Sequence, residues 1–575
     1  MTRHHRARLW RSGLASAAAL TVAVGITGAS PVSRPAPAQP KLNLIAASDS
    51  VVLDRYVGEP GEPSGVYLDL GTYLAVEGPA LEFRVTRASY KDPVVARQII
   101  RSGGKTVTKT LPKGLVKDFS GLPDFLQVTL ADSAGKVVAA QKEAFCPNNA
   151  ASRIRPDGPA KAKFPESCPT NPFTLGSVWG IQHGWAANTY ASFYGAPLDV
   201  PDGQYAATVS VTKKYRDLLG IPHQPKKLKV TVRTPAPTPS GEGARASAAG
   251  GHGSHGTGHA GQGSHGGHGG HGAPKSTLGL GRAHLQGYGV DTPAPPALPW
   301  ALKKQGLKAA ASGDGPGRTD GSRIAPPRQP AAQRPTSRAS VPANVPKPDL
   351  RALPAWDIYI SAGPEGETPG RDHLAFSSTT WNAGPSPLVV DGFRQPNKGL
   401  MDAYQYFYDA KGKQVGYAPT GTMEWDPREG HVHWHFTDFA AYRLLKADQR
   451  EVVRSDKEAF CLVNTDAVDY TVKNANWHPF GTDLGSACGE ENSMSVRQSL
   501  DVGSGDTYAG YLPGQTFDIT DVPNGTYWIQ IVANPDKRLK ETDLTNNTSL
   551  RKVVLGGKPG ARTVTVPPHE LITSR

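Results

Sequence analysis

Long apolar runs and long helical patterns are both missing from this sequence of 575 residues. Beyond the N-terminal region, no stretch approaches the roughly 18 uninterrupted apolar residues that a membrane-spanning helix needs. No long segment repeats apolar residues at the spacing of an amphipathic helix. Cysteine is scarce, with four in the whole chain. These absences exclude a bundle of membrane-spanning helices and argue against an all-helical fold.

The N-terminal segment has the layout of a secretory signal. Residues 1–12 are basic, residues 13–28 are small and apolar, and Ala29-Ser30 then opens a Pro-rich stretch. The apolar run is too short for an ordinary membrane span, and no nearby cysteine offers a site for a lipid anchor. We therefore predict a signal peptide at residues 1–29 and a secreted, extracellular protein. In that compartment the even number of cysteines favours disulfides over free thiols.

The chain is basic, with a formal net charge of +13 and a pI near 9.4. Such a charge permits contact with polyanions, for example an anionic cell wall. Much of the basic excess lies in the signal segment and in residues 300–350, and no nucleic-acid motif with aromatic platforms is present. We therefore expect no nucleic-acid partner, and the oligomeric state stays open.

A long stretch of low complexity, residues 233–347, divides the chain. It is rich in Pro, Gly, Ala, Ser and His and cannot bury enough apolar surface to fold, so we predict a disordered linker. Its centre carries glycine-spaced histidines, which either gather around a metal ion or belong to a solvated spacer, and both interpretations stay open. These histidines are His252, His255, His259, His265, His268 and His271. The predicted domains are residues 49–232 and 348–556, with a tail at 557–575.

The two flanking segments resemble each other. QKEAFCPNN at 141–149 matches DKEAFCLVN at 456–464, and DVPDGQYAATVSV matches DVPNGTYWIQIVA. The offset drifts from 315 at the lysine (457 − 142) to 322 at the valine (522 − 200), as a duplication with small loop insertions would leave it. Four cysteines allow three pairings, of which the repeat favours the local pairs Cys146–Cys168 and Cys461–Cys488.

Both copies have the pattern of β-strands. Segments such as TYWIQIVA, FRVTRASY and YQYFYDAKGKQVGY alternate apolar with polar residues or are rich in β-branched and aromatic residues. The breaks between them fall at turn sequences such as Pro-Asn-Gly and Pro-Asp-Gly. We predict a mainly β protein with two β-sandwich-like domains and long loops.

The strongest chemical signal is GHVHWHFTDF at 430–439. Side chains alternate along a strand, so His431, His433 and His435 share one face while apolar residues occupy the other. Three imidazoles suit copper or zinc and leave a coordination position open for water, O2 or substrate. The alternative to a metal site is a polar strand face exposed to solvent, and the apolar intervening residues argue against it. The first copy has Lys117, Phe119 and Gly121 at the matching positions, so it lacks the site.

Residues 349–555 resemble the lysyl oxidase catalytic domain, through EW, HVHWH, DKEAFCL, AC, DTY, FDITDVPNGTYWIQIVANP and ETDLTNN in that order. The resemblance implies a copper amine oxidase that oxidises primary amines, such as peptidyl lysine, with O2 to an aldehyde, H2O2 and ammonia. It implies that His431, His433 and His435 bind copper. It also implies that Lys457 and Tyr508 form the cofactor lysine tyrosylquinone.

The resemblance also implies a calcium site that joins the start of the domain to its end. The implied ligands are Asp349, the Leu350 carbonyl, Glu541, Asp543, Asn546 and Asn547. Hard oxygen ligands suit Ca²⁺, although Asp and Asn clusters also form ordinary turns and caps. The catalytic base stays open between Asp438 and Asp506, either of which could equally be a solvated or capping carboxylate. Residues 481–510 are acidic, which suits a cationic amine substrate.

The sequence also departs from the animal members of that family. Those enzymes carry further histidines and disulfides around the copper motif, whereas here Asp426 follows Trp425 and Ala441 precedes Tyr442. Without copper ligands beside them, Lys142 and Tyr190 of the first copy do not predict a second quinone. Two alternatives to the oxidase are a non-catalytic extracellular copper-binding or wall-associated scaffold and a zinc hydrolase. The hydrolase is disfavoured because no helical Glu accompanies the histidines.

Overall fold

The structure is a computed structural model, which describes the chain from residue 38 to residue 569 with internal gaps. The described ranges are 38–56, 64–190, 197–234, 334–361, 370–395, 398–427, 433–448, 450–455, 459–478, 488–489, 491–512 and 514–569. The predicted signal peptide, most of the predicted linker, His431 and Lys457 lie outside the described residues. Predictions about them stay predictions.

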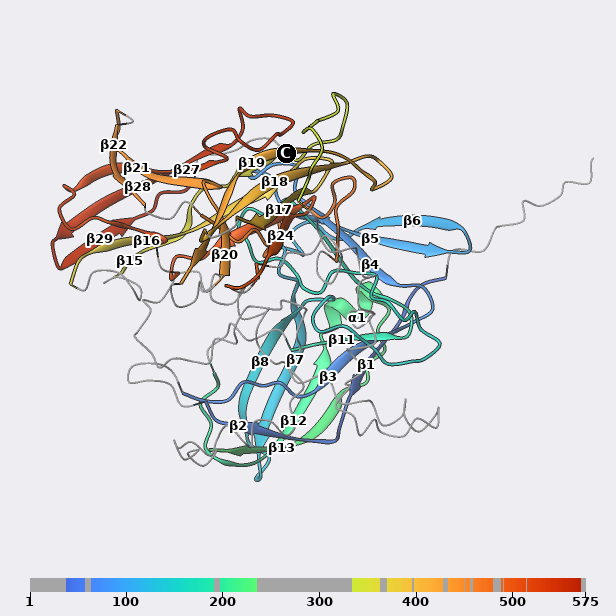
Figure 1. Cartoon of the computed structure of the whole chain (residues 1–575). Helices are drawn as coiled ribbons and strands as arrows, with labels where there is room; N and C mark the ends of the chain where they lie inside the picture. Colours follow the sequence, from blue (N-terminus) through green and yellow to red (C-terminus); the bar gives the residue numbers. More distant parts are fainter. Residues whose placement is uncertain are drawn as a thin grey trace, which may run out of the picture.

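The prediction of a mainly β protein is confirmed. The described residues form 29 strands and one short helix, α1 (Lys213–Leu219). Figure 1 shows two lobes, which we call the N-terminal lobe (residues 38–234) and the C-terminal lobe (residues 334–569). Each lobe contains three sheets around a core of its own. No helix among the described residues is long and apolar enough to cross a membrane.

The N-terminal lobe has sheets of four, four and five strands. The first has the order β1 (Lys41–Ala46), β3 (Thr72–Glu77), β11 (Trp185–Asn188), β9 (Ser152–Arg153). The second has the order β10 (Gly176–Ile181), β4 (Leu81–Thr86), β5 (Val95–Ser102), β6 (Lys105–Thr110). The third has the order β2 (Ser50–Asp54), β13 (Lys226–Arg233), β12 (Gly203–Val211), β7 (Leu122–Asp132), β8 (Val137–Phe145).

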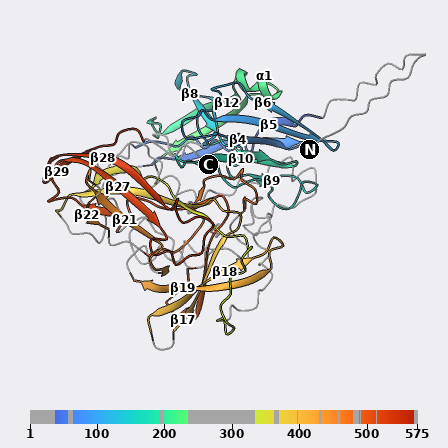
Figure 2. The ribbon, with the colours of Figure 1, turned by 90° about the horizontal axis from the view of Figure 1, so that it is seen from above.

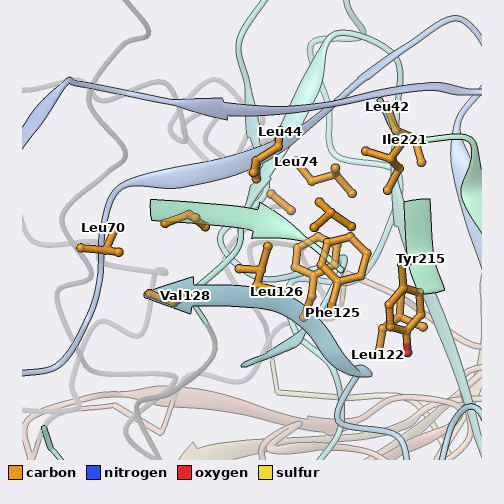
Figure 3. Close-up of a cluster of buried hydrophobic side chains, with 14 of the residues drawn as sticks. Leu42, Leu44, Leu70, Leu74, Leu122, Phe125, Leu126, Val128, Tyr215 and Ile221 are labelled. Carbon is orange, nitrogen blue, oxygen red and sulfur yellow. The ribbon is translucent and has the colours of Figure 1, made fainter. Parts of the chain in front are cut away.

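The core of the N-terminal lobe follows from the alternation within its strands. Inward residues of β1, β3 and β7 meet between the sheets, among them Leu42, Leu74 and Leu126 (Figure 3). Phe125 is fully buried, and its ring centroid lies 5.1 Å from that of Tyr215 on α1. Burial of such side chains is worth roughly 1.5–3 kcal/mol each, which is why the alternating segments pair as sheets.

The C-terminal lobe has sheets of six, five and five strands. In the first, β14 (Leu350–Ala352), β16 (His373–Asn382), β25 (Ser504–Tyr508) and β23 (Asp466–Ala467) follow one another, and β15 (Trp356–Ser361) and β26 (Thr516–Asp518) also pair with β16. The second has the order β20 (His433–Phe436), β19 (Gln414–Asp426), β18 (Leu400–Tyr408), β17 (Leu388–Arg394), β24 (Ser495–Leu500). The third has the order β22 (Glu451–Arg454), β21 (Ala440–Leu445), β27 (Gly525–Ala533), β28 (Thr548–Lys558), β29 (Ala561–Thr565).

The sheets of the two lobes have matching strand orders. The series β8-β7-β12-β13 corresponds to β22-β21-β27-β28, and the series β10-β4-β5-β6 corresponds to β24-β17-β18-β19. Details match as well, because the Tyr205 and Tyr527 hydroxyls each donate to a proline carbonyl four residues earlier, at 2.7 Å. Asp124 and Asp438 both adopt positive φ, of 53° and 55°. Among the described residues of the N-terminal lobe, no strand corresponds to β20, because the sheet β10-β4-β5-β6 ends at β6.

The folded segments extend beyond the predicted domain boundaries. Strand β1 begins at Lys41, before the predicted start at residue 49, and β29 lies in the predicted tail. Ser340, in the predicted linker, exchanges backbone hydrogen bonds of 3.1 and 2.9 Å with Tyr417. The residues around Ser340 and in β29 lack a strong apolar pattern of their own. They are ordered by hydrogen bonds to strands that are distant in sequence, which composition does not reveal.

The lobes lie side by side and touch (Figure 2). The Leu175 N–H donates to the Val468 carbonyl at 2.8 Å, and the Tyr470 N–H donates to the Gly176 carbonyl at 2.9 Å. An apolar cluster shared by the two lobes accompanies these bonds; its buried members are Tyr90, Phe173, Leu175, Leu353, Trp356, Trp381 and Val468. The contact therefore combines sheet pairing with burial of large side chains.

Candidate metal and cofactor site

Strand β20 carries two of the three predicted metal ligands, His433 and His435. Trp434 and Phe436 point into the core with 0% and 2% exposure, as the alternation predicts. His435 is buried, His433 is half-buried, and their ring centroids lie 4.6 Å apart. The strand therefore packs one face and turns two imidazoles to the other.

Strand β20 is held by hydrogen bonds to three other parts of the chain. The Trp434 N–H donates to the Cys488 carbonyl at 2.9 Å, and the Gln498 side-chain amide donates to the Trp434 carbonyl at 2.7 Å. Phe436 and Phe460 exchange backbone hydrogen bonds of 2.7 and 3.0 Å. The other edge of the strand pairs with β19, so the histidines are presented on a rigid element.

A buried carboxylate lies beside these histidines. Asp426, the last residue of β19, is the register partner of His433. Its Oδ2 lies 3.3 Å from Nδ1 of His435, and the two side chains are 8% and 1% exposed. In the sequence, Asp426 is notable only as a departure from the family pattern. It follows Trp425 and comes just before the histidine motif, a spacing that suits a hairpin and could have indicated this contact.

Tyr508 lies at the end of β25, next to the segment that pairs with β20. Its hydroxyl accepts a hydrogen bond from the Cys461 N–H at 3.1 Å. Its ring meets that of Phe460 edge to face, with centroids 4.4 Å apart. Burial raises the pKa of Tyr508 well above its usual value, and the negative charges of Asp506 and Asp426 raise it further. The phenol is therefore protonated at neutral pH and lies within electrostatic reach of the carboxylate beside the histidines.

The two predicted candidates for the base have different surroundings. Asp506 is 3% exposed and sits two residues before Tyr508, so both side chains are on the same face of β25. Its charge contributes to the raised pKa of both Tyr508 and Tyr442. Asp438, in contrast, lies in the turn after β20 and forms an ion pair with Arg538 at 2.6 Å. Asp506 therefore shares a face of one strand with Tyr508, whereas Asp438 is paired with Arg538.

The lysyl oxidase family model matches residues 408–562, which include β20, the Cys461–Cys488 segment and Tyr508. This chain carries a lysyl oxidase family domain. Lysyl oxidase homolog 3B of Danio rerio is 33% identical over 128 residues, or 22% of this chain and 14% of that protein. Lysyl oxidase homolog 3 of Homo sapiens is 32% identical over 22% of this chain and 15% of its own. Lysyl oxidase homolog 2 of Xenopus tropicalis is 30% identical over 136 residues, 23% of this chain and 16% of that protein.

This chain therefore spans about one-seventh of the length of the curated relatives that it matches. Among solved structures, a tetra-tandem repeat from the extending region of a large adhesion protein is 7% identical, covering 90% of this chain and 99% of that one. Its TM-score of 0.09 carries no argument about the fold.

Both predicted disulfides are confirmed. Cys146 pairs with Cys168 and Cys461 pairs with Cys488, each with a Cα–Cα distance of 5.9 Å. In the lysyl oxidase domain the second bridge joins two contacts of the site, because Cys461 binds the Tyr508 hydroxyl and Cys488 binds β20. A bridge that closes a loop of this size stabilises the fold by about 3 kcal/mol in the chain-entropy account.

Most of the predicted calcium ligands gather where β14 meets the loop between β27 and β28. The Leu350 N–H donates to Glu541 at 2.6 Å. The Asn546 amide donates to Asp349 at 3.0 Å, and the Asn547 amide donates to Glu541 at 2.9 Å. Asp543 is exposed and accepts from the Thr545 hydroxyl at 2.7 Å.

The cluster of Asp349, Glu541, Asn546 and Asn547 has a carboxyl group with a raised pKa and two buried oxygens without a hydrogen bond among the described residues. Burial raises the pKa of Glu541 to about 7, and the charge of Asp349 adds to the shift. The Oδ1 atoms of Asn546 and Asn547 are buried without a hydrogen-bond partner among the described residues. The described residues nevertheless contain no group of three or more His, Cys, Asp or Glu side chains arranged around a common point. The cluster is therefore two carboxylates and two amide oxygens rather than an acidic cage.

Proposed function

We propose that this protein is a secreted copper-dependent amine oxidase of the protein-lysine 6-oxidase type. One observation carries the proposal: the strand with His433 and His435 pairs through Phe436 with Phe460, whose ring packs on Tyr508. These contacts hold the histidines and Tyr508, the groups expected to bind copper and to form the quinone, in one part of the C-terminal lobe. The family match of residues 408–562 supports the same activity.

The described donors fit copper, because imidazole nitrogen is a ligand that suits this metal. His435 turns Nδ1 towards Asp426, so Nε2 is the nitrogen directed away from that carboxylate. His431, two residues before His433, would complete a three-imidazole set by strand alternation. Bound copper, with a lysine tyrosylquinone made from Lys457 and Tyr508, would supply the redox chemistry that converts a primary amine, O2 and water into an aldehyde, H2O2 and ammonia.

The chain's own groups would take up the proton that the substrate loses. Asp506 is buried on the same face of β25 as Tyr508, and we assign it the removal of the proton from the carbon next to the substrate nitrogen. The Tyr442 hydroxyl lies 2.7 Å from the Ser378 hydroxyl, and burial raises its pKa, so it remains a neutral phenol beside Asp506. A buried site of this kind strengthens each electrostatic contact made to the reacting groups.

The substrate that we propose is a primary amine on an extended chain, such as a lysine side chain of a peptide. A cationic amine is favoured near Tyr508 by the buried acids Asp506 and Asp426. Calcium at the cluster of Asp349, Glu541, Asn546 and Asn547 would tie the first strand of the lobe to the loop between β27 and β28. We further propose that the N-terminal lobe is a duplicated copy without copper ligands, for which the matching strand orders give support.

Peptide mass spectrometry of copper-loaded, secreted protein tests the proposal. We expect a covalent link between the peptides that contain Lys457 and Tyr508, together with copper retained by wild type and lost when His433 and His435 are replaced by alanine. The matching pair Lys142 and Tyr190 is an internal control in the same digest and should be unlinked. Unlinked Lys457 and Tyr508 in protein that holds copper would instead support the alternative, an extracellular copper-binding scaffold without catalysis.

A further inference from the structure

The hairpin of β19 and β20 places two carboxylates on the face that carries the histidines. In register, Glu424 lies opposite His435 and Asp426 lies opposite His433. Register partners in an antiparallel pair point to the same side of the sheet. The two acids differ in their surroundings, because Glu424 is exposed whereas Asp426 is 7% exposed.

Asp426 contacts the histidine that lies diagonally across the strand pair. Its Oδ2 lies 3.3 Å from Nδ1 of His435, a ring that is 1% exposed. A carboxylate at Nδ1 fixes the proton on that nitrogen, which leaves the lone pair of Nε2 for a metal. It also sets the rotation of the ring and makes the free nitrogen a stronger donor. The burial of both partners keeps this contact from being exchanged for water.

The charge of the same carboxylate also acts on the tyrosine. Burial is the main cause of the raised pKa of Tyr508, and the negative charges of Asp506 and then Asp426 add to it. One side chain therefore acts on a metal ligand and on the residue that the metal is expected to oxidise.

We propose that Asp426 is the positioning residue of the copper centre, and that it orients His435 by accepting a hydrogen bond from Nδ1 so that Nε2 coordinates the metal. This inference rests on the proposed copper site. It concerns a residue that neither the histidine motif nor the quinone pair identifies. Asp426 contacts His435, a predicted copper ligand, so its effect should be seen first in metal binding.

The test compares copper binding by the full-length wild type, Asp426→Ala, Asp426→Asn and, as a matched control, Glu424→Gln. Copper affinity is measured by competition titration, and the copper environment is measured by electron paramagnetic resonance. For Asp426→Ala we expect a dissociation constant about 10- to 100-fold higher and changed copper hyperfine coupling. Asp426→Asn keeps an acceptor oxygen but lacks the charge, so it should recover part of the affinity. Glu424→Gln should match wild type in both measurements.

The outcomes separate the two proposals. If wild type binds copper tightly and both Asp426 variants match it in affinity and spectrum, the positioning role is wrong while the copper site stands. If wild type itself binds no copper at its histidines, the proposed function fails first, and this inference fails with it. Thermal unfolding of each metal-free variant guards against a folding defect, and Asp426→Asn remains informative if Asp426→Ala does not fold.

Discussion

At the scale of single residues, Asp501 illustrates how burial shifts a pKa in this lobe. It is 4% exposed and exchanges hydrogen bonds with Asn464, accepting from the side-chain amide at 3.2 Å and donating its N–H at 2.7 Å. Burial raises its pKa to about 6, although the Asn476 and Asn464 amides oppose the shift. The carboxylate is therefore more easily ionised in the unfolded chain than in the folded one.

This shift predicts a pH dependence of stability with a defined sign. The pKa of Asp501 is higher in the folded state, so its favourable contribution is complete below pH 4 and is lost as the pH rises through about 6. Relative to wild type, Asp501→Asn should gain up to about 3 kcal/mol of unfolding free energy between pH 4 and pH 8. Urea unfolding of both proteins across this range measures the gain. A difference between them that does not change with pH would contradict the prediction.

At the scale of elements, the join between β14 and the loop after β27 depends on oxygen and amide groups. Asp349 accepts from Asn546, and Glu541 accepts from Leu350 and Asn547. With two amide oxygens still unsatisfied, the hydrogen bonds alone leave the cluster incomplete. A hard cation would use these oxygens and would favour the ionised form of Glu541.

Calcium should therefore raise the thermal unfolding midpoint of the protein, and its removal by a chelator should lower it. At a calcium concentration about 100 times the dissociation constant, the stabilisation is about 2.7 kcal/mol. Asp349→Asn should lose this response. Asp536→Asn should keep it, because Asp536 instead forms an ion pair with Arg538 at 2.7 Å. Wild-type midpoints that are equal with calcium and with chelator would rule out the site.

At the scale of the whole molecule, the two lobes are joined at a glycine. Gly176 lies in β10 and forms a parallel bridge with Asp469 of the C-terminal lobe. A Cβ at this position would overlap the Asp469 carboxylate and the Thr471 hydroxyl. The close approach of the lobes therefore requires a residue without a side chain.

Gly176→Val should separate the lobes without unfolding either one, since overpacking of this kind costs about 1–3 kcal/mol. We expect a larger radius of gyration by small-angle X-ray scattering and two thermal transitions in place of one. Gly399→Ala is the control, because its Cβ would meet nothing within 4 Å. Unchanged scattering from Gly176→Val would show that the lobe contact tolerates a side chain.

The sequence by itself determined the features that depend on local pattern. Alternation in HVHWHF predicted that the histidines and Trp434 lie on opposite faces, and the structure buries Trp434 completely. The repeat around Ala-Phe-Cys predicted both disulfides, which the structure contains. Strand-like composition predicted a mainly β fold. Each of these rests on spacing along a strand or on loop length, which the order of residues contains directly.

Only the tertiary structure decided which distant groups meet. It placed Asp426 against His435, and it placed Asp438 in an ion pair with Arg538. It also extended the lobes to β1 and β29 and joined them at Gly176. These contacts depend on the register between strands and on the packing of sheets. Alternation along a strand fixes the face that Asp426 takes, but it does not say which residue of the next strand lies opposite.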